Sequence, residues 1–232
     1  MLKWKNSVLC YIIFVFLFLC GILWGNRAVT VISEKTPIIR NHCVVIDAGH
    51  GGVDGGATSC TGQLESSYNL QIAQRLNDLL RLLGHDTVMV RKTDISVYTN
   101  GETIAQQKVS DLKERVRIVN ETPDSILLSI HQNNFPDSRY KGAQVFYGNS
   151  DSIQLAKNLQ EQLVANLNPG SNRQIKKSTG IYLMDHIDRP GVLIECGFLS
   201  NPEEEAKLRS DYYQKNMCCV IAAALGQYLS NS

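Results

Sequence analysis

Four side chains that could bind a metal ion or move a proton stand beside predicted strands and helices. His50 and His131 each follow a short apolar run that is typical of a buried strand. Glu195 ends a third run of this kind, and Glu65 precedes an amphipathic stretch with helical period. Because loops at the carboxyl ends of parallel strands converge on one crevice in open α/β sheets, these four residues can meet although they are far apart in sequence.

The residue types predict the chemistry of such a site. Two neutral imidazoles and one carboxylate are a known protein ligand set for catalytic zinc, and they leave the fourth coordination position to water. The ion lowers the pKa of that water toward about 7 and polarises a carbonyl oxygen. A second carboxylate can take the proton of the water and pass it to a leaving amine. The residues therefore indicate a metal-dependent hydrolase of an amide, but no short motif among them establishes which three bind the metal.

The first predicted strand runs into a loop rich in glycine, which would let the backbone approach a ligand closely. Neither the phosphate-binding motif G-x-x-x-x-G-K-[ST] nor the dinucleotide motif G-x-G-x-x-G fits Gly49, Gly51 and Gly52. Asp54, which follows them, would repel a phosphate. The loop therefore points to His50 as its functional residue and not to nucleotide binding.

The three remaining histidines are weaker candidates for the site. His42 and His85 adjoin the starts of predicted strands, where a turn or surface role is expected. His186 follows residues 180–185, which precede the strand that carries Glu195, and it could face the same cleft.

Short apolar runs alternate with amphipathic stretches along the chain. Strands are predicted at residues 43–47, 87–90, 126–130, 143–147 and 192–194, and helices at 66–83, 108–120, 153–167, from 202 and near the C-terminus. The alternation predicts a single α/β domain with a mainly parallel, twisted sheet flanked by helices on both faces. Within residues 108–120, the helical period predicts a buried face made of Val109, Leu112, Val116 and Val119.

The composition limits the other functional classes. The chain has 232 residues, of which 44% are hydrophobic and 19% are charged, which suits one globular domain with a short appendage. The formal net charge of +1 gives no reason to expect a nucleic-acid partner, since phosphate neutralisation needs a concentrated excess of Lys and Arg. The seven cysteines include no C-x-x-C pair, and their odd number argues against a fold held by disulfides.

The N-terminus predicts a membrane segment. Lys3 and Lys5 precede residues 8–24, a run that contains no charged residue. We interpret this run as an uncleaved signal anchor, because no small-x-small cleavage site follows it and nothing amphipathic in it favours a buried core helix. The lysines place the N-terminus in the cytoplasm, so the rest of the chain is expected outside.

The expected domain organisation follows from this segment. Residues 1–7 are expected in the cytoplasm, 8–24 across the membrane as a signal anchor, 25–41 as a linker and 42–232 as an extracytoplasmic catalytic domain. Cleavage of the segment would instead release the catalytic domain as a secreted protein.

Several segments occur together in one known family of enzymes. They are residues 46–52, Glu65, and residues 129–133, 142–144 and 195–201. Together they resemble the zinc-dependent N-acetylmuramoyl-L-alanine amidases of the amidase-3 type, over the chain from about residue 42 to the C-terminus. The N-terminal anchor, the lack of wall-binding repeats and residues 180–184 and 198–202 are further similar to the spore-cortex members of that family.

This resemblance implies roles for the candidate residues. His50, Glu65 and His131 are expected to bind zinc (Zn2+), and Glu195 to be the catalytic carboxylate. The reaction implied is hydrolysis of the amide bond between N-acetylmuramic acid and the L-alanine of the stem peptide in peptidoglycan. Asn133 is a further candidate, for orienting the substrate.

The similarity to spore-cortex amidases also implies a biological setting. In those enzymes the cut prepares the sugar for muramic δ-lactam formation by a partner deacetylase, and the lactam is read by germination lytic enzymes. The resemblance thus implies action on the cortex side of the forespore in a spore-forming bacterium. Because several amidases of this kind are restrained until a partner acts, an activating lipoprotein or other protein partner is also expected.

Two other hypotheses remain open at this point. Cys196 could act as a nucleophile with His131 as its base, in which case chelation of metal would leave the enzyme active. Alternatively, the chain could be a catalytically silent module that binds peptidoglycan, and such a module would have no need for zinc.

Overall fold

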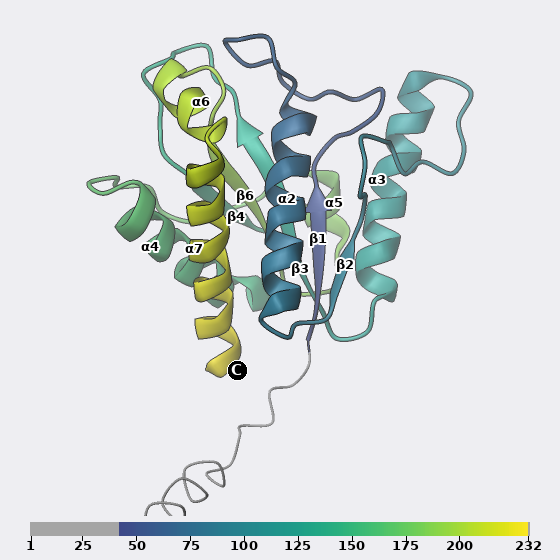
Figure 1. The fold of residues 1–232 in the computed structure, drawn as a ribbon. Coiled ribbons are helices and arrows are strands. Elements are labelled where there is room, and N and C mark those ends of the chain that lie inside the picture. Colours follow the sequence, from purple (N-terminus) through teal and green to yellow (C-terminus); the bar gives the residue numbers. More distant parts are fainter. Residues whose placement is uncertain (1–41, 232) are drawn as a thin grey trace, which may run out of the picture. The chain divides into compact units, whose positions relative to one another are not determined.

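Six strands form the sheet at the centre of residues 42–231, the part of the chain that this computed structural model describes (Figure 1). They are β1 (Cys43–Ala48), β2 (Thr87–Met89), β3 (Ser125–Asn133), β4 (Gln144–Tyr147), β5 (Lys176–Lys177) and β6 (Gly191–Phe198). Their order in the sheet is β2-β1-β3-β6-β4-β5. All neighbours pair in parallel except β4 and β6, which are antiparallel. The prediction of a mainly parallel sheet is therefore confirmed, and β4 is its antiparallel member.

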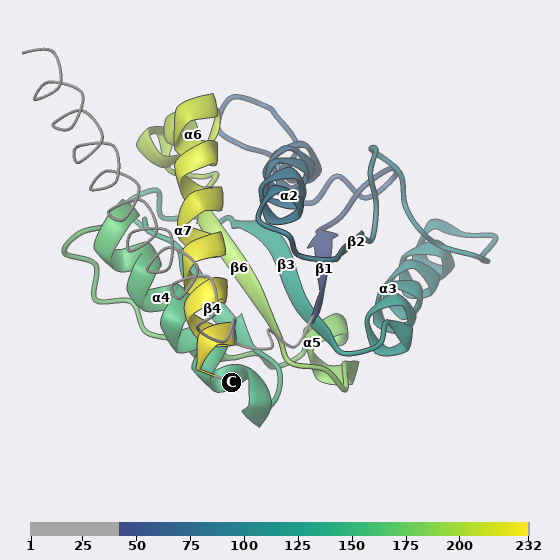
Figure 2. The ribbon, with the colours of Figure 1, turned by 60° about the horizontal axis from the view of Figure 1, so that its bottom comes forward.

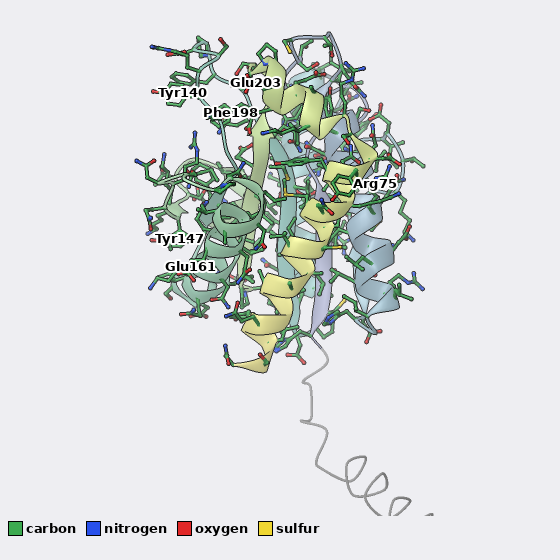
Figure 3. The ribbon with its side chains drawn as sticks, turned by 60° about the vertical axis from the view of Figure 1, so that its left-hand side comes forward. Arg75, Tyr140, Tyr147, Glu161, Phe198 and Glu203 are labelled. Atoms are coloured by element: carbon green, nitrogen blue, oxygen red, sulfur yellow. The ribbon has the colours of Figure 1, made fainter. Side chains whose placement is uncertain are left out.

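Helices cover both faces of the sheet (Figure 2). One face carries α2 (Glu65–Leu82), α4 (Ile153–Leu167) with the preceding turn η1 (Ser150–Ser152), α6 (Pro202–Leu208) and α7 (Asp211–Ser230), and the other carries α3 (Ile104–Glu121) and α5 (Tyr182–His186). Figure 3 shows the edge of the domain with Tyr147 of β4 and Glu161 of α4. Alternate residues of β3 serve the two faces, since Ile126, Leu128 and Ile130 lie in the core cluster of α2, α4 and α7, whereas Leu127 lies in the smaller opposite cluster.

The turn before α6 contains the capping residue of this helix. Asn201 accepts hydrogen bonds on its side-chain oxygen from the backbone N–H groups of Glu203 and Glu204, and Pro202 occupies the first turn. Acidic residues in that turn add a favourable interaction with the helix dipole. The helix predicted from residue 202 is therefore confirmed.

The predicted buried face of α3 is wrong in part. Val109 is 51% exposed and Leu112 is 37% exposed, whereas Ser110, Arg115 and Val119 are buried. The reason is a set of polar contacts that periodicity does not reveal. Arg115 binds Asp47 of β1, and the Ser110 hydroxyl accepts from the backbone N–H groups of Thr99 and Asn100.

The N-terminal predictions lie outside the described residues. Residues 1–7, the segment 8–24 and the linker up to residue 41 precede the described part of the chain. Within residues 42–231, no helix combines the length and the apolar character needed to cross a membrane. The five cysteines of this part are free thiols, in agreement with a fold that is not held by disulfides.

A buried ion pair joins α3 to the central sheet. The Arg115 guanidinium binds the Asp47 carboxylate of β1, and both side chains are almost fully buried. The second Asp47 oxygen accepts from the Ser129 hydroxyl at 2.7 Å, and Asp111 binds the Nε of Arg115 at 2.6 Å. Burial raises the pKa of Asp47, but Arg115 and the hydroxyl outweigh this effect and hold the pKa below its usual value. The pair is thus fully satisfied in the interior.

Loss of one partner would leave the other charge buried and unpaired. We expect Arg115→Ala to lower the free energy of unfolding by about 3–5 kcal/mol, because Asp47 would remain in the core without its cation. Urea denaturation of the two proteins measures the difference. Arg117→Ala is the matched control on the same helix, since Arg117 binds Glu114 and Glu121 at the surface and its loss should have little effect. Equal effects of the two substitutions would contradict the structural role given to Arg115.

Candidate active site

Two arginines hold the backbone that carries His50. The Ala48 carbonyl oxygen accepts from Arg91 Nε at 2.8 Å and from Arg115 Nη1 at 3.1 Å. The Gly49 carbonyl accepts from Arg91 Nη2 at 3.0 Å, and the His50 carbonyl accepts from Arg115 Nη2 at 2.8 Å. His50 itself has a φ of 61°, in the left-handed region that few non-glycine residues adopt. The guanidinium groups of Arg91 and Arg115 therefore hold the loop after β1 in one conformation.

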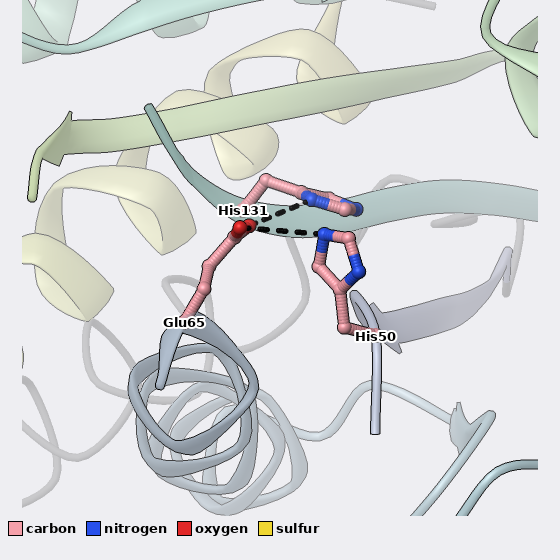
Figure 4. A group of neighbouring side chains, drawn as sticks. All are labelled: His50, Glu65 and His131. Atoms are coloured by element: carbon pink, nitrogen blue, oxygen red, sulfur yellow. Dashed lines mark hydrogen bonds and ion pairs between the residues drawn. The ribbon is translucent and has the colours of Figure 1, made fainter. Parts of the chain in front are cut away.

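His50, Glu65 and His131 converge at the carboxyl ends of β1 and β3 (Figure 4). His50 Nε2 lies 3.3 Å from Glu65 Oε2, and His131 Nδ1 lies 3.1 Å from Glu65 Oε1. One ligand atom of each residue lies within 4.8 Å of those of the other two. This spacing and the N, N, O donor set suit a divalent cation such as zinc, so the three side chains could hold a metal ion.

The Glu65 carboxylate is held by further donors. Its Oε2 accepts from the Ala57 N–H at 3.0 Å, and its Oε1 accepts from the Gln132 N–H at 3.1 Å and from Asn69 Nδ2 at 3.2 Å. Burial raises the pKa of Glu65, but the hydrogen bonds and charges of the two histidines outweigh it and lower the pKa strongly. The carboxylate is therefore ionised and fixed, as a metal ligand must be.

Asp54 orients the ring of His50. Its Oδ2 lies 3.0 Å from His50 Nδ1, and its Oδ1 accepts from Lys108 Nζ at 3.0 Å. A proton on Nδ1 facing Asp54 leaves Nε2 free to bind a metal, which is the usual arrangement around a ligating histidine. Burial lowers the pKa of His50, but Glu65 and Asp54 together raise it to about 9, so a metal must displace a proton to bind here.

Glu195 lies on the neighbouring strand. It pairs with His131 in the parallel register of β3 and β6, so both side chains leave the sheet on the same face. Its Oε2 is buried and has no hydrogen-bond partner among residues 42–231. Burial raises the pKa of Glu195 to about 7, and the nearby Glu65 charge acts in the same direction. A carboxyl with a buried, unsatisfied oxygen beside the cluster is suited to accept and donate a proton.

A cavity of about 320 Å³ adjoins the two histidines and extends between α3 and α5. Its walls include the apolar side chains of Val53, Leu112 and Ile181. The partly exposed Val53 and Leu112 thus have a place in a cavity wall, although they contribute little to the core. The arrangement offers a reactive group at one end of a space large enough for part of a ligand.

The remaining sequence candidates lie outside the three-residue cluster. Asn133 ends β3, and its carbonyl accepts from the Leu199 N–H at 2.8 Å, while its side chain makes no hydrogen bond to any described residue. His42 Nδ1 lies 3.2 Å from the Asp124 carbonyl oxygen, and His186 stacks on Tyr182 with ring centroids 4.0 Å apart.

Cys196 is poorly placed for nucleophilic chemistry. It is 1% exposed and belongs to the core cluster on the face of the sheet opposite to Glu195. Burial strongly raises the pKa of its thiol, whereas a nucleophilic cysteine needs a lowered pKa. These observations argue against the hypothesis of a Cys196 nucleophile.

Sequence reasoning missed the residues that hold the cluster in place. The sequence predicts for Asp54 only repulsion of a phosphate, whereas in the fold its carboxylate lies 3.0 Å from His50 Nδ1. Lys108 and Arg115 gave no signal, because they come from α3 and meet the loop only in the folded chain.

Comparison with known proteins identifies the family of the chain. The profile of the family described as N-acetylmuramoyl-L-alanine amidase matches residues 44–227, which is nearly all of the described domain. The chain therefore belongs to the N-acetylmuramoyl-L-alanine amidases, and the enzyme class expected from the sequence is confirmed.

Individual relatives agree with this assignment. The chain is 34% identical to the germination-specific N-acetylmuramoyl-L-alanine amidase of Bacillus subtilis (strain 168), over 99% of this chain and 95% of the relative. It is similar to the solved structure of the CwlD amidase from Clostridioides difficile in complex with the GerS lipoprotein, with 36% identity and a TM-score of 0.79, over 83% of this chain and 100% of that one. The catalytic domain of CwlV from Bacillus (Paenibacillus) polymyxa var. colistinus gives 28% identity and a TM-score of 0.68, over 82% and 99%.

The close packing of Gly49 against His131 leads to a testable prediction. A Cβ added to Gly49 would overlap the His131 imidazole, so Gly49→Ala must displace that ring. We expect metal affinity to fall on the order of tenfold or more, with a loss of stability of about 1–3 kcal/mol from overpacking. Metal titration followed by thermal unfolding measures both effects.

Gly226→Ala in α7 is the matched control. No atom lies within 4 Å of a Cβ built there, so the substitution should stabilise the helix by about 0.5–1 kcal/mol and leave metal binding unchanged. Unaltered metal affinity in Gly49→Ala would show that the His131 ring does not take part in metal binding.

Proposed function

We propose that the protein is a zinc-dependent enzyme that hydrolyses the amide bond between N-acetylmuramic acid and L-alanine in peptidoglycan. His50, Glu65 and His131 would hold the ion. The observation that carries this proposal is the convergence of two imidazoles and an ionised carboxylate, with ligand atoms within 4.8 Å of one another. Two histidines and a glutamate are a donor set of catalytic zinc sites, which keep one position open for chemistry.

The chemistry needs both a Lewis acid and a proton carrier. Bound zinc would polarise the scissile carbonyl and acidify water. Glu195 would take a proton from the attacking water as its oxygen bonds to the carbonyl carbon, and would donate that proton to the nitrogen of L-alanine as the C–N bond breaks. The products are the carboxylate of the muramoyl lactyl group and a peptide with a free amino terminus. The unpaired buried oxygen of Glu195 supports this role, because a purely structural carboxyl would have a partner.

The alternative of a catalytically silent binding module is less well supported. A module that only binds sugar or peptide would not need the Glu65 carboxylate between the imidazoles of His50 and His131. It would also not need the second carboxyl, Glu195, beside them. Asn133 is proposed as a substrate-binding residue, since its side chain stands two residues beyond His131 with no hydrogen bond to the described residues.

The biological role proposed is modification of the spore cortex. Its support is the 34% identity to a relative named germination-specific, over nearly the whole length of both chains. In this setting the cut would prepare muramic acid for δ-lactam formation by a deacetylase. An activating lipoprotein is proposed as a partner, because a similar amidase was solved in complex with one.

The enzyme is proposed to act outside the cytoplasmic membrane. Residues 1–7 would lie in the cytoplasm, 8–24 would anchor the chain, 25–41 would form the linker, and 42–232 would be the catalytic domain on the side of the wall. The support is the uncharged run 8–24 behind Lys3 and Lys5, together with a substrate class that lies outside the cell.

Two isosteric substitutions separate the proposed roles. Glu195→Gln should keep bound zinc but lower kcat for release of amino ends from peptidoglycan by about 10²–10⁴, because the amide cannot carry the proton. Glu65→Gln should lose zinc and activity together, because it weakens a ligand. Zinc content is measured alongside amino-end release, with circular dichroism to check folding.

Either role can fail separately in this experiment. Loss of zinc in Glu195→Gln would make Glu195 a ligand and not the proton carrier. Full activity in Glu65→Gln, or activity that survives removal of zinc by a chelator, would reject the metal mechanism. Cys196→Ala should remain active, since its thiol lies in the core.

A further inference from the structure

A second cavity, of about 950 Å³, lies at the edge of the sheet beyond β4. We call it the basic groove, after the five basic residues that line it: Arg139, Lys141, Arg173, Lys176 and Lys207. Its walls come from the segment before β4, the segment between α4 and β5, and α6. None of these residues belongs to the proposed zinc site.

The charge of the basic groove is not balanced by the protein. Glu204 is the single acidic lining residue, and its Oε2 is buried and accepts from the N–H groups of Gly142 at 2.7 Å and Phe198 at 3.2 Å. Arg139 is paired with Asp137 at 2.6 Å. The other four basic residues form no salt bridge with any residue of the described domain. An anionic ligand would find uncompensated positive charge here.

Arg173 is held in a defined orientation within the groove. Its guanidinium lies 4.8 Å from the ring centroid of Phe198. Nε donates to the Lys141 carbonyl oxygen at 2.9 Å and Nη1 donates to Gln144 Oε1 at 3.1 Å, whereas Nη2 has no hydrogen-bond partner among the described residues. Tyr140 and Phe198, labelled in Figure 3, lie side by side with centroids 6.2 Å apart. The Arg173 guanidinium is therefore held in a fixed orientation with a free N–H group, which favours binding of a carboxylate.

The groove lies near the carboxyl end of β6, the strand that carries the proposed catalytic carboxylate. Arg173 lies over Phe198, the last residue of β6 and three residues beyond Glu195 on the same strand. Gln144, which binds Arg173, is 1% exposed, and its side-chain amide also donates to Gln160 of α4. The smaller cavity, which apolar and charged side chains line together, adjoins His50 and His131. The reacting groups thus have a partly apolar space on one side and a basic groove on the other.

We infer that the basic groove binds the peptide part of the substrate through its free carboxylates, and that Arg173 determines specificity for acidic stem peptides. The inference rests on the proposed amide cleavage, in which the leaving group is the amino end of a peptide. A peptide that extends from Glu195 toward Phe198 at the end of β6 reaches Arg173 first and the three exposed lysines after it. The sugar would then occupy the cavity between α3 and α5.

Equilibrium binding tests this assignment without turnover. The ligand is a soluble peptide that begins with L-alanine and carries free carboxylates, compared with the same peptide in which those carboxylates are amidated. We expect calorimetry on the full-length protein in detergent to show tighter binding of the acidic peptide, and Arg173→Gln to weaken that binding by about tenfold or more while leaving the amidated peptide unaffected. Lys215→Gln, at an exposed position on α7, is the control and should change neither affinity.

A second variant covers the case in which Arg173→Gln disturbs the fold. Lys207→Gln changes an exposed side chain of the groove and should weaken acidic-peptide binding about threefold, with a shallower dependence on salt. Equal loss for acidic and amidated peptides in both variants, no difference between the peptides in the wild type, or binding of inorganic polyphosphate but not of the acidic peptide would overturn the inference.

The outcome is distinguishable from failure of the proposed function. Peptide binding that depends on Arg173 in a protein that releases no amino ends would count against the catalytic assignment alone. Normal amide release with no preference for free carboxylates would count against the basic groove alone.

Discussion

The Glu65 carboxylate lies between the two imidazoles, and much of the surrounding structure keeps it there. Glu65 is the first residue of α2, so its position depends on how the preceding loop meets the domain. Glu205 of α6 anchors that loop, because its Oε1 accepts hydrogen bonds from the hydroxyl groups of Thr61 and Tyr68 at 2.5 Å. The N–H groups of Ala57 and Gln132 then complete the hydrogen bonds of Glu65 itself. A carboxylate placed in this way meets the need of a metal site for ligands that do not move.

Two buried arginines fix the loop that carries His50. Arg91 and Arg115 are buried, and both donate to backbone carbonyls of the loop that carries His50. Burial of a guanidinium is unfavourable unless its donors are satisfied, and here Asp47, Asp111 and carbonyl oxygens satisfy Arg115. The left-handed backbone of His50 is the strained element that these contacts maintain. The loop that carries His50 is therefore held rigid by polar contacts in the core.

The sequence was sufficient for most of the architecture, and it placed the four candidate site residues beside the strands and the helix that carry them. Periodicity located all the strands except β5 and all the longer helices, and the rule that parallel strand ends converge predicted that His50, His131 and Glu195 lie close together. The short α5 and the two-residue β5 carry too few residues to show a period. The antiparallel direction of β4 could not be predicted, because the apolar pattern of a short buried strand is the same in both directions. The inner face of α3 was missed since Arg115 finds Asp47 only across the fold. The basic groove was also missed, because its lysines and arginines come from three separate segments that have ordinary composition.

The most direct test of the account is anomalous diffraction at the zinc edge from crystals of the protein grown with zinc. The account predicts one strong peak within about 2.0–2.2 Å of His50 Nε2, His131 Nδ1 and an oxygen of Glu65, with Glu195 beside the ion but not bound to it. A peak at another place, or a site in which Glu195 takes the position of Glu65 as a ligand, would contradict it.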